Sequence, residues 1–176
     1  TGWPLPPWSS AAALLCVPSV AMCYTIEVDW TASDFVVMGV LFASVLGAYE
    51  FLASRAPSFT YRAASVLTTL GLFLLIWMNL AVGIIGSENN DANFMFAGVI
   101  AIIVGGACIA QFKPLGMSRA LLAAATAQAA IGGIALAGDL GTDGRGWPRD
   151  VIVLTIFYTG LWVTAAALFR LSAREG

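Results

Sequence analysis

Long apolar runs, separated by short polar turns, dominate the pattern of this 176-residue chain. A helix needs about 20 consecutive apolar residues to cross the hydrocarbon core of a bilayer. The runs predict an all-α polytopic integral membrane bundle of six transmembrane helices, at about 8–26, 34–54, 62–86, 92–112, 118–138 and 151–169. The first predicted span is the weakest, because Pro18 lies near its middle and would kink the helix. All six would form one transmembrane domain over residues 1–176.

The stretch from Trp77 to Asn93 holds the densest set of polar groups in the chain. Asn79 lies inside the third apolar run, two glycines follow near its end, and an acidic, amide-rich turn comes next. In a bilayer this turn belongs at the water interface, and the Asn79 amide needs a partner inside the bundle.

Composition identifies lipid as the solvent of this chain. Hydrophobic residues make up 60% of the sequence and charged residues 10%, with a mean hydropathy of +0.88. Soluble domains carry about 25% charged residues. Cys16, Cys23 and Cys108 all lie in apolar runs, where we expect small buried core residues.

Motifs for chemistry are missing from the sequence. There is no His, no phosphate-binding loop, no nucleophile motif and no metal-ligand spacing. We therefore predict no cofactor, no metal site and no enzyme activity. No basic patch is present either, so nucleic acid is not an expected partner.

The basic residues divide unequally between the two sets of predicted turns. Six lie on one side, namely Arg55, Arg62, Lys113, Arg119, Arg170 and Arg174, while Arg145 and Arg149 lie with most carboxylates on the other. The positive-inside rule then predicts that both termini are cytoplasmic, which agrees with an even number of spans.

A weak internal echo appears at a shift of 57 residues, which aligns Pro57 with Pro114 and Arg62 with Arg119. A duplicated hairpin would produce this match, with two equivalent hairpins packed about a pseudo-twofold axis. Chance matches are also common in sequences this rich in apolar residues. Both interpretations stay open.

Three polar residues inside predicted spans are candidates for function. Glu50 is the one carboxylate well inside a span, about one turn from its end, and is either an interface anchor near Arg55 and Arg62 or part of a proton or cation path. Asn79 and Gln128 lie deeper and either hold helices together or bind a ligand. For Gln128 we predict a hydrogen bond to another helix.

Small residues at helical spacing predict close helix packing in spans two, four and five. The positions are Gly39, Ala43, Gly47, Gly105, Gly106, Gly132 and Gly133.

Two segments resemble parts of a known group of proteins. The runs from Asn79 to Glu88 (NLAVGIIGSE) and from Trp30 to Gly39 (WTASDFVVMG) are similar to segments of small uncharacterised bacterial inner-membrane proteins. The resemblance covers most of the chain. It implies a multi-pass protein of the bacterial inner (plasma) membrane, and it carries over no activity and no site residues.

Two functions follow from these features. The first is a non-catalytic membrane protein that acts through helix packing, as an accessory or structural subunit of a larger membrane complex or as a homo-oligomer. The second is a small transporter or channel with a polar path near Glu50, Asn79 and Gln128. A cavity lined by Glu50 with Asn79 or Gln128 would favour transport, and a flat outer face of small residues would favour a membrane-protein partner.

Overall fold

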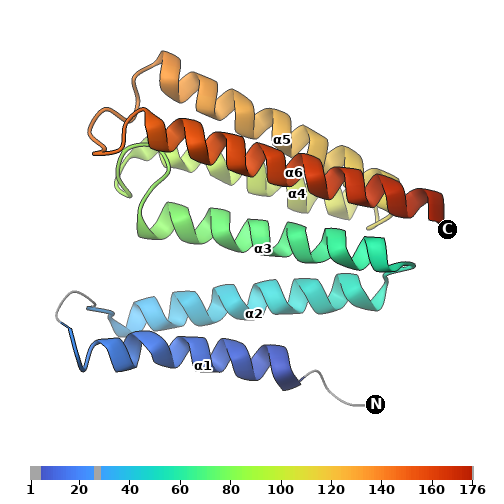
Figure 1. Cartoon of the computed structure of the whole chain (residues 1–176), viewed down its shortest axis with the longest axis horizontal. Helices are drawn as coiled ribbons and strands as arrows, with labels where there is room; N and C mark the ends of the chain where they lie inside the picture. Colours follow the sequence, from blue (N-terminus) through green and yellow to red (C-terminus); the bar gives the residue numbers. More distant parts are fainter. Residues whose placement is uncertain (1–4, 26–28, 176) are drawn as a thin grey trace. The chain divides into compact units, whose positions relative to one another are not determined.

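The structure, a computed structural model, describes residues 5–25 and 29–175, with side chains from residue 8 onward (Figure 1). All regular secondary structure in these residues is helical. The elements are α1 (Leu5–Ala21), α2 (Ala32–Ser54), α3 (Phe59–Ala81), the short 3-10 helix η1 (Asp91–Phe94), α4 (Met95–Ile109), α5 (Pro114–Ala137) and α6 (Arg149–Glu175).

Five of these helical segments are long and apolar enough to cross a membrane. They are α2, α3, η1 with α4, α5 and α6, whereas α1 has only 17 residues. The all-helical class is therefore confirmed. The exact number of spans stays a prediction, because α1 is the segment on which the sixth span depends.

The chain divides into two compact units, and the boundary falls inside α2 between Phe51 and Leu52. In the first unit, α1 and α2 run antiparallel. The indole N–H of Trp8, early in α1, donates to Oε1 of Glu50, late in α2, at 2.6 Å. Leu15 lies against Gly39 in the middle of the pair.

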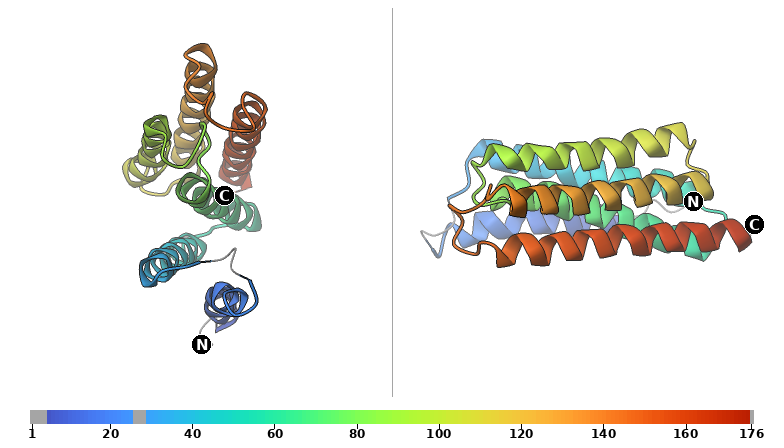
Figure 2. Two further views of the ribbon diagram at one scale, coloured as in Figure 1. Left: turned by 90° about the vertical axis from the view of Figure 1, so that its left-hand side faces the viewer. Right: turned by 90° about the horizontal axis from the view of Figure 1, so that it is seen from above.

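The second unit is built around α6. This helix packs on both α5 and α3, and α4 packs on the other side of α5 (Figure 2). The core between them contains large buried side chains, among them Tyr61, Leu75, Leu121, Trp162 and Phe169. The rings of Tyr61 and Phe169 meet edge to face, with their centroids 5.0 Å apart.

The outward faces of the second unit carry many large apolar side chains. Ile109 is 87% exposed, Phe94 79% and Ile156 68%, and many further Leu, Ile and Val side chains are exposed beside them. Large contiguous apolar patches are rare on soluble monomers, and exposed apolar side chains in this number are unusual for one. In a bilayer the same faces contact lipid chains, so the folded surface agrees with the composition.

The third predicted span ends too late. We predicted a helix over 62–86, but α3 ends at Ala81 and the chain turns from residue 82 onward. Gly83 and Gly86 have φ of +78° and +73°, which an α-helix does not accept. The apolar composition of residues 82–85 hid this turn.

The other spans also differ from prediction at their ends. The predicted 92–112 is η1 followed by α4, which ends at Ile109 because Gln111 and Phe112 take positive φ. The predicted 118–138 begins earlier, with Pro114 in the first helical turn, where a missing N–H costs nothing. The span predicted at 151–169 is the longer helix α6, over 149–175, and the span predicted at 34–54 is α2, over 32–54. The predicted 8–26 starts and ends earlier, as α1, and residue 26 lies outside the described residues.

The predicted segregation of charge is visible in the second unit. At one end, Tyr61 Oη donates to the carbonyl of Phe112 at 2.8 Å, and the hydroxyls of Ser58 and Ser172 lie 3.0 Å apart. These contacts join the segments that carry the six basic residues, so we call this the basic end. The opposite end holds the turns 82–94 and 138–148 and is called the acidic end. Which end faces the cytoplasm stays a prediction.

Candidate functional site

A buried amide organises the acidic end. Oδ1 of Asn93 accepts hydrogen bonds from the backbone N–H groups of Ile84 and Ile85, both at 2.9 Å. Its Nδ2 donates to the carbonyl of Ser87 at 2.7 Å and to that of Ile85 at 3.3 Å. Asn93 therefore replaces the helical partners that residues 84–87 lose when α3 ends. The sequence pattern predicts Asn93 in a turn at the water interface, and its burial differs from that prediction; the signal for it is an Asn that opens an apolar run just after a glycine-containing turn.

A second amide ties this turn to the loop before α6. Nδ2 of Asn90 donates to the carbonyl of Leu140 at 2.5 Å, and Ser87 Oγ donates to Oδ2 of Asp143 at 3.1 Å. Gly86 lies directly against Asp143, so a Cβ at this position would collide with its carboxylate. The two turns of the acidic end thus form one hydrogen-bonded assembly.

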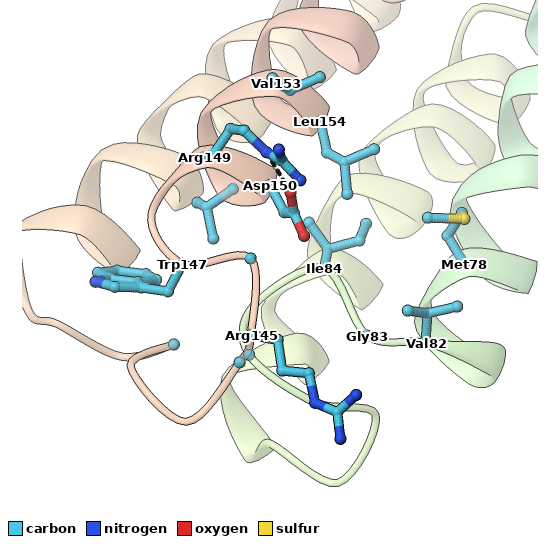
Figure 3. A pocket seen from close by; sticks show the side chains of 15 residues that line it. Met78, Val82, Gly83, Ile84, Arg145, Trp147, Arg149, Asp150, Val153 and Leu154 are labelled. Carbon is cyan, nitrogen blue, oxygen red and sulfur yellow. Dashed lines mark hydrogen bonds and ion pairs between the residues drawn. The ribbon is translucent and has the colours of Figure 1, made fainter.

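A pocket of about 540 Å³ lies between this assembly and the helices α3 and α6 (Figure 3). We call it the loop pocket. Its apolar wall contains Met78, Val82, Ile84, Val151, Val153 and Leu154, and its charged lining consists of Arg145, Arg149 and Asp150. Figure 3 shows Arg149 at the α6 edge and Arg145 on the loop, at different edges of the pocket. Nε of Arg149 lies 3.2 Å from Oδ1 of Asp150.

Asn79 lines a separate pocket of about 450 Å³ between α3, η1 and α4. Its Nδ2 donates to the carbonyl of Leu75, four residues earlier in the same helix, at 2.7 Å. The Leu75 carbonyl can only accept, so it is bonded by the amide nitrogen of Asn79 and not by its oxygen. The amide oxygen Oδ1 of Asn79 is buried and receives no hydrogen bond from the described residues. The bond of Asn79 therefore stays within α3, and Gln128 is not part of this pocket's lining.

Gln128 is fully buried in α5, as its mid-span depth predicted. The structure gives neither Oε1 nor Nε2 a hydrogen-bond partner among the described residues. The predicted bond to another helix is thus absent there. A buried polar group left in this state costs about 1–3 kcal/mol.

Helix α6 carries polar atoms in the same condition. Thr155, Thr159 and Trp162 lie at helical spacing, and their hydroxyl oxygens and indole nitrogen are buried without partners in the described part of the chain. Thr155 packs against Gly132, which lies one turn beyond Gln128 on α5. Since the two helices are antiparallel neighbours, Thr159 is placed at the level of Gln128.

Several other helical hydroxyls, unlike those of Thr155 and Thr159, are paired with backbone carbonyls. Ser65, Thr68 and Thr69 in α3 donate to carbonyls of their own helix at 2.8–2.9 Å, and Thr126 and Thr164 do the same at 3.0 and 2.7 Å. Such bonding is the usual way for a helical hydroxyl to avoid a cost in lipid. Thr155 and Thr159 do not use it, so the contact of α5 with α6 contains a strip of unpaired polar atoms.

Glu50 belongs to the first unit, where it is partly buried and accepts the hydrogen bond from Trp8. This contact joins the first and last turns of the α1–α2 pair. Neither its role as an interface anchor nor its role in a proton or cation path is decided by this bond.

In each of the pairs Gly105–Gly106 and Gly132–Gly133, one glycine packs against a neighbouring helix and the other is exposed. Gly106 lies against Ala120 of α5, and Gly132 against Thr155 of α6. Gly105 and Gly133, by contrast, are exposed, and a Cβ at either would meet nothing within 4 Å. In the first unit Gly39 faces Leu15, Ala43 is exposed, and Gly47 has open space.

Metal-ligating side chains do not gather in the part of the chain that the structure describes, where no three His, Cys, Asp or Glu residues come together. The three cysteines are exposed, with Cys16 on α1, Cys108 on α4 and Cys23 in the turn after α1, so the expectation that they are core residues is wrong. In apolar runs that face lipid, a small apolar side chain needs no burial by protein.

Together, the helices and their apolar outer faces define a membrane-embedded helical protein. Comparison of the chain with protein-family models, curated proteins and solved structures finds no match in any of the three. The function therefore has to be inferred from the chain's own residues.

Proposed function

We propose that this chain is a non-catalytic integral membrane subunit that associates with a transmembrane helix of another chain. The observation that carries the proposal is the outer face of α4. Gly98, Ala101 and Gly105 are exposed there at helical spacing, and a Cβ at either glycine would meet nothing within 4 Å. Helices associate in membranes through faces of small residues, because their backbones can then approach closely.

The location that we propose is the bacterial inner membrane, with both termini in the cytoplasm. The resemblance of the segments at 30–39 and 79–88 supports the membrane, and the separation of basic from acidic ends supports the orientation. Reporter fusions after Glu175 and within the loop 139–150 test the orientation. The two reporters must give signals from opposite sides, and signals from the same side would contradict the topology.

The association is tested by purification from native membranes in mild detergent, followed by mass spectrometry and a measurement of oligomeric mass. Gly98→Leu with Gly105→Leu should weaken the complex by about 1–2 kcal/mol, or roughly tenfold. Gly160→Leu on α6 is the matched control, since Gly160 is also exposed with open space around it. A chain that stays monomeric in native membranes, or an equal effect of the control, would contradict the proposal.

The second function, transport through a polar path, is favoured by the strip at Gln128, Thr155 and Thr159. Polar atoms that find no partner in a bundle interior are where a permeating polar species can bind. Flux of protons or cations into liposomes that is lost in Gln128→Leu and in Glu50→Gln would support this function. Flux that is absent from the wild-type protein would exclude these ions as its substrates.

A further inference from the structure

The two arginines of the acidic end are not distributed like its carboxylates. Both Arg145 and Arg149 line the loop pocket, whereas Glu88, Asp91 and Asp139 lie elsewhere and Asp143 lies against Gly86, outside the lining. Asp150 is the carboxylate in the lining. Two arginines against one aspartate leave a net positive charge in the pocket, within an end that is otherwise negative.

We propose that the loop pocket binds the anionic headgroup of a phospholipid from the surrounding bilayer. An arginine guanidinium offers five N–H donors in a planar arrangement that matches the oxygens of a phosphate. Arg149 uses Nε toward Asp150, and its other nitrogens make no bond to described protein groups; Arg145 makes none. The side chain of Arg149 is 81% exposed, so its donors are accessible to a ligand.

The apolar wall favours a lipid over a soluble anion. Val82 and Val153 line the pocket and are also more than half exposed, so the wall continues onto the surface that faces lipid chains. A phospholipid can place its headgroup between the two arginines, which lie at different edges of the pocket, and its first methylene groups along Val82, Val153 and Met78. The pocket volume of about 540 Å³ lies in the range of about 300–1,000 Å³ that is usual for small-molecule sites.

The position along the helices fits the same ligand. The pocket lies at the end of α3 and the first turn of α6, where the chain passes from polar turns to apolar spans. Phospholipid phosphates lie at this boundary in a bilayer. Trp147, beside the pocket, is of the residue type that is enriched at this level.

Retention of lipid by the purified full chain tests the proposal. The protein is placed in nanodiscs that contain equal amounts of phosphatidylglycerol and phosphatidylcholine, and the lipids that remain bound in detergent are measured by native mass spectrometry. We expect phosphatidylglycerol to be retained preferentially. Each of Arg145→Gln and Arg149→Gln should lower its retention about fivefold, and the double variant about thirtyfold, since one arginine contributes about 1 kcal/mol near an anionic surface.

Matched variants separate this site from general attraction of charge. Arg119→Gln and Arg174→Gln remove exposed arginines at the basic end and should leave retention unchanged. Val153→Trp should lower retention with all charges intact, because the larger side chain narrows the apolar wall. A thermal melt confirms that each variant is folded.

Three results would overturn the inference. Equal retention of phosphatidylglycerol and phosphatidylcholine would show that the pocket does not select the negatively charged headgroup. A loss in Arg119→Gln as large as in the pocket variants would show unspecific attraction. Binding of soluble glycerol phosphate as strong as that of the lipid would assign the pocket to a free phosphate. None of these results affects the proposed association through α4, which is measured separately.

Discussion

Asn93 and Gln128 are both buried amides of the second unit, yet their surroundings differ completely. Asn93 makes hydrogen bonds through both of its amide atoms, and Gln128 makes none to described protein groups. The difference follows from the backbone around each residue. Asn93 lies beside a turn, where backbone groups have left the helix and need partners. Gln128 lies in the middle of α5, where the backbone N–H and C=O groups are already paired with one another within the helix. For these two residues, the amide beside a turn is thus satisfied and the amide in mid-helix is left open.

The largest expected effect comes from the satisfied amide. Asn93→Ala removes the partner of two N–H groups and two carbonyls in this turn, at about 1–3 kcal/mol for each group left buried and unpaired. We expect a loss of roughly 3 kcal/mol or more in the free energy of unfolding, measured by a thermal melt in detergent. Asn89→Ala is the control, because Asn89 is exposed and bonds only to the neighbouring Glu88 side chain. An equal loss of stability in both variants would contradict the prediction that the hydrogen bonds of Asn93 stabilise the turn.

Gly86→Ala tests the turn that Asn93 supports. Gly86 has a φ of +73° and lies against Asp143, so a methyl group introduces both backbone strain and a collision. We expect a loss of about 1–3 kcal/mol in the free energy of unfolding. Gly133→Ala is the matched control, since Gly133 is helical with open space and Ala has the higher helix propensity by up to about 1 kcal/mol. A stable Gly86→Ala variant would contradict the packing of the two turns.

Gln128→Leu tests the open amide, and here the structure reverses our expectation from the sequence. A hydrogen bond to another helix would make the variant less stable by about 0.6–2 kcal/mol. Without that bond, Leu removes two unpaired polar atoms, and we expect a melting temperature that is unchanged or higher. Thr126→Val, at an exposed hydroxyl that bonds to its own helix, should have little effect. A marked loss of stability in Gln128→Leu would show that the amide has a partner, such as bound water.

The smallest change in stability is expected at Glu50. Unlike the amides of Asn93 and Gln128, its carboxylate accepts one hydrogen bond, from Trp8, at the end of the α1–α2 pair. Glu50→Gln keeps an oxygen that can accept from the indole of Trp8, so the melting temperature should change by less than the equivalent of about 1 kcal/mol. Glu50→Leu, which removes the acceptor, provides the comparison. A large loss of stability in Glu50→Gln would show that the negative charge itself holds α1 and α2 together.

The helices follow directly from the sequence because lipid leaves the backbone few alternatives. In hydrocarbon each N–H and C=O must be paired within the chain, so a long apolar run forms a helix whatever its neighbours are. The existence of α2 to α6 and the separation of their basic from their acidic turns were therefore predictable. The ends of these helices were not, since they depend on side chains distant in sequence. Residues 82–85 are as apolar as the helix before them. The N–H groups of Val82 and Gly83 bond back to Met78, and those of Ile84 and Ile85 are paired by the distant side chain of Asn93.

Sequence alone thus determined that this is an all-helical protein suited to a membrane and that Gln128 is deep. Tertiary structure decided which glycine of each pair faces a neighbour, because Gly105 and Gly106 differ by only 100° around the helix axis. It also brought Arg145 and Arg149 to the same pocket as Met78, more than sixty residues earlier. Periodicity describes a single helix, whereas a pocket depends on the angles and turns that join several. For this reason the loop pocket and the unpaired strip beside Gln128 could be found only in the folded chain.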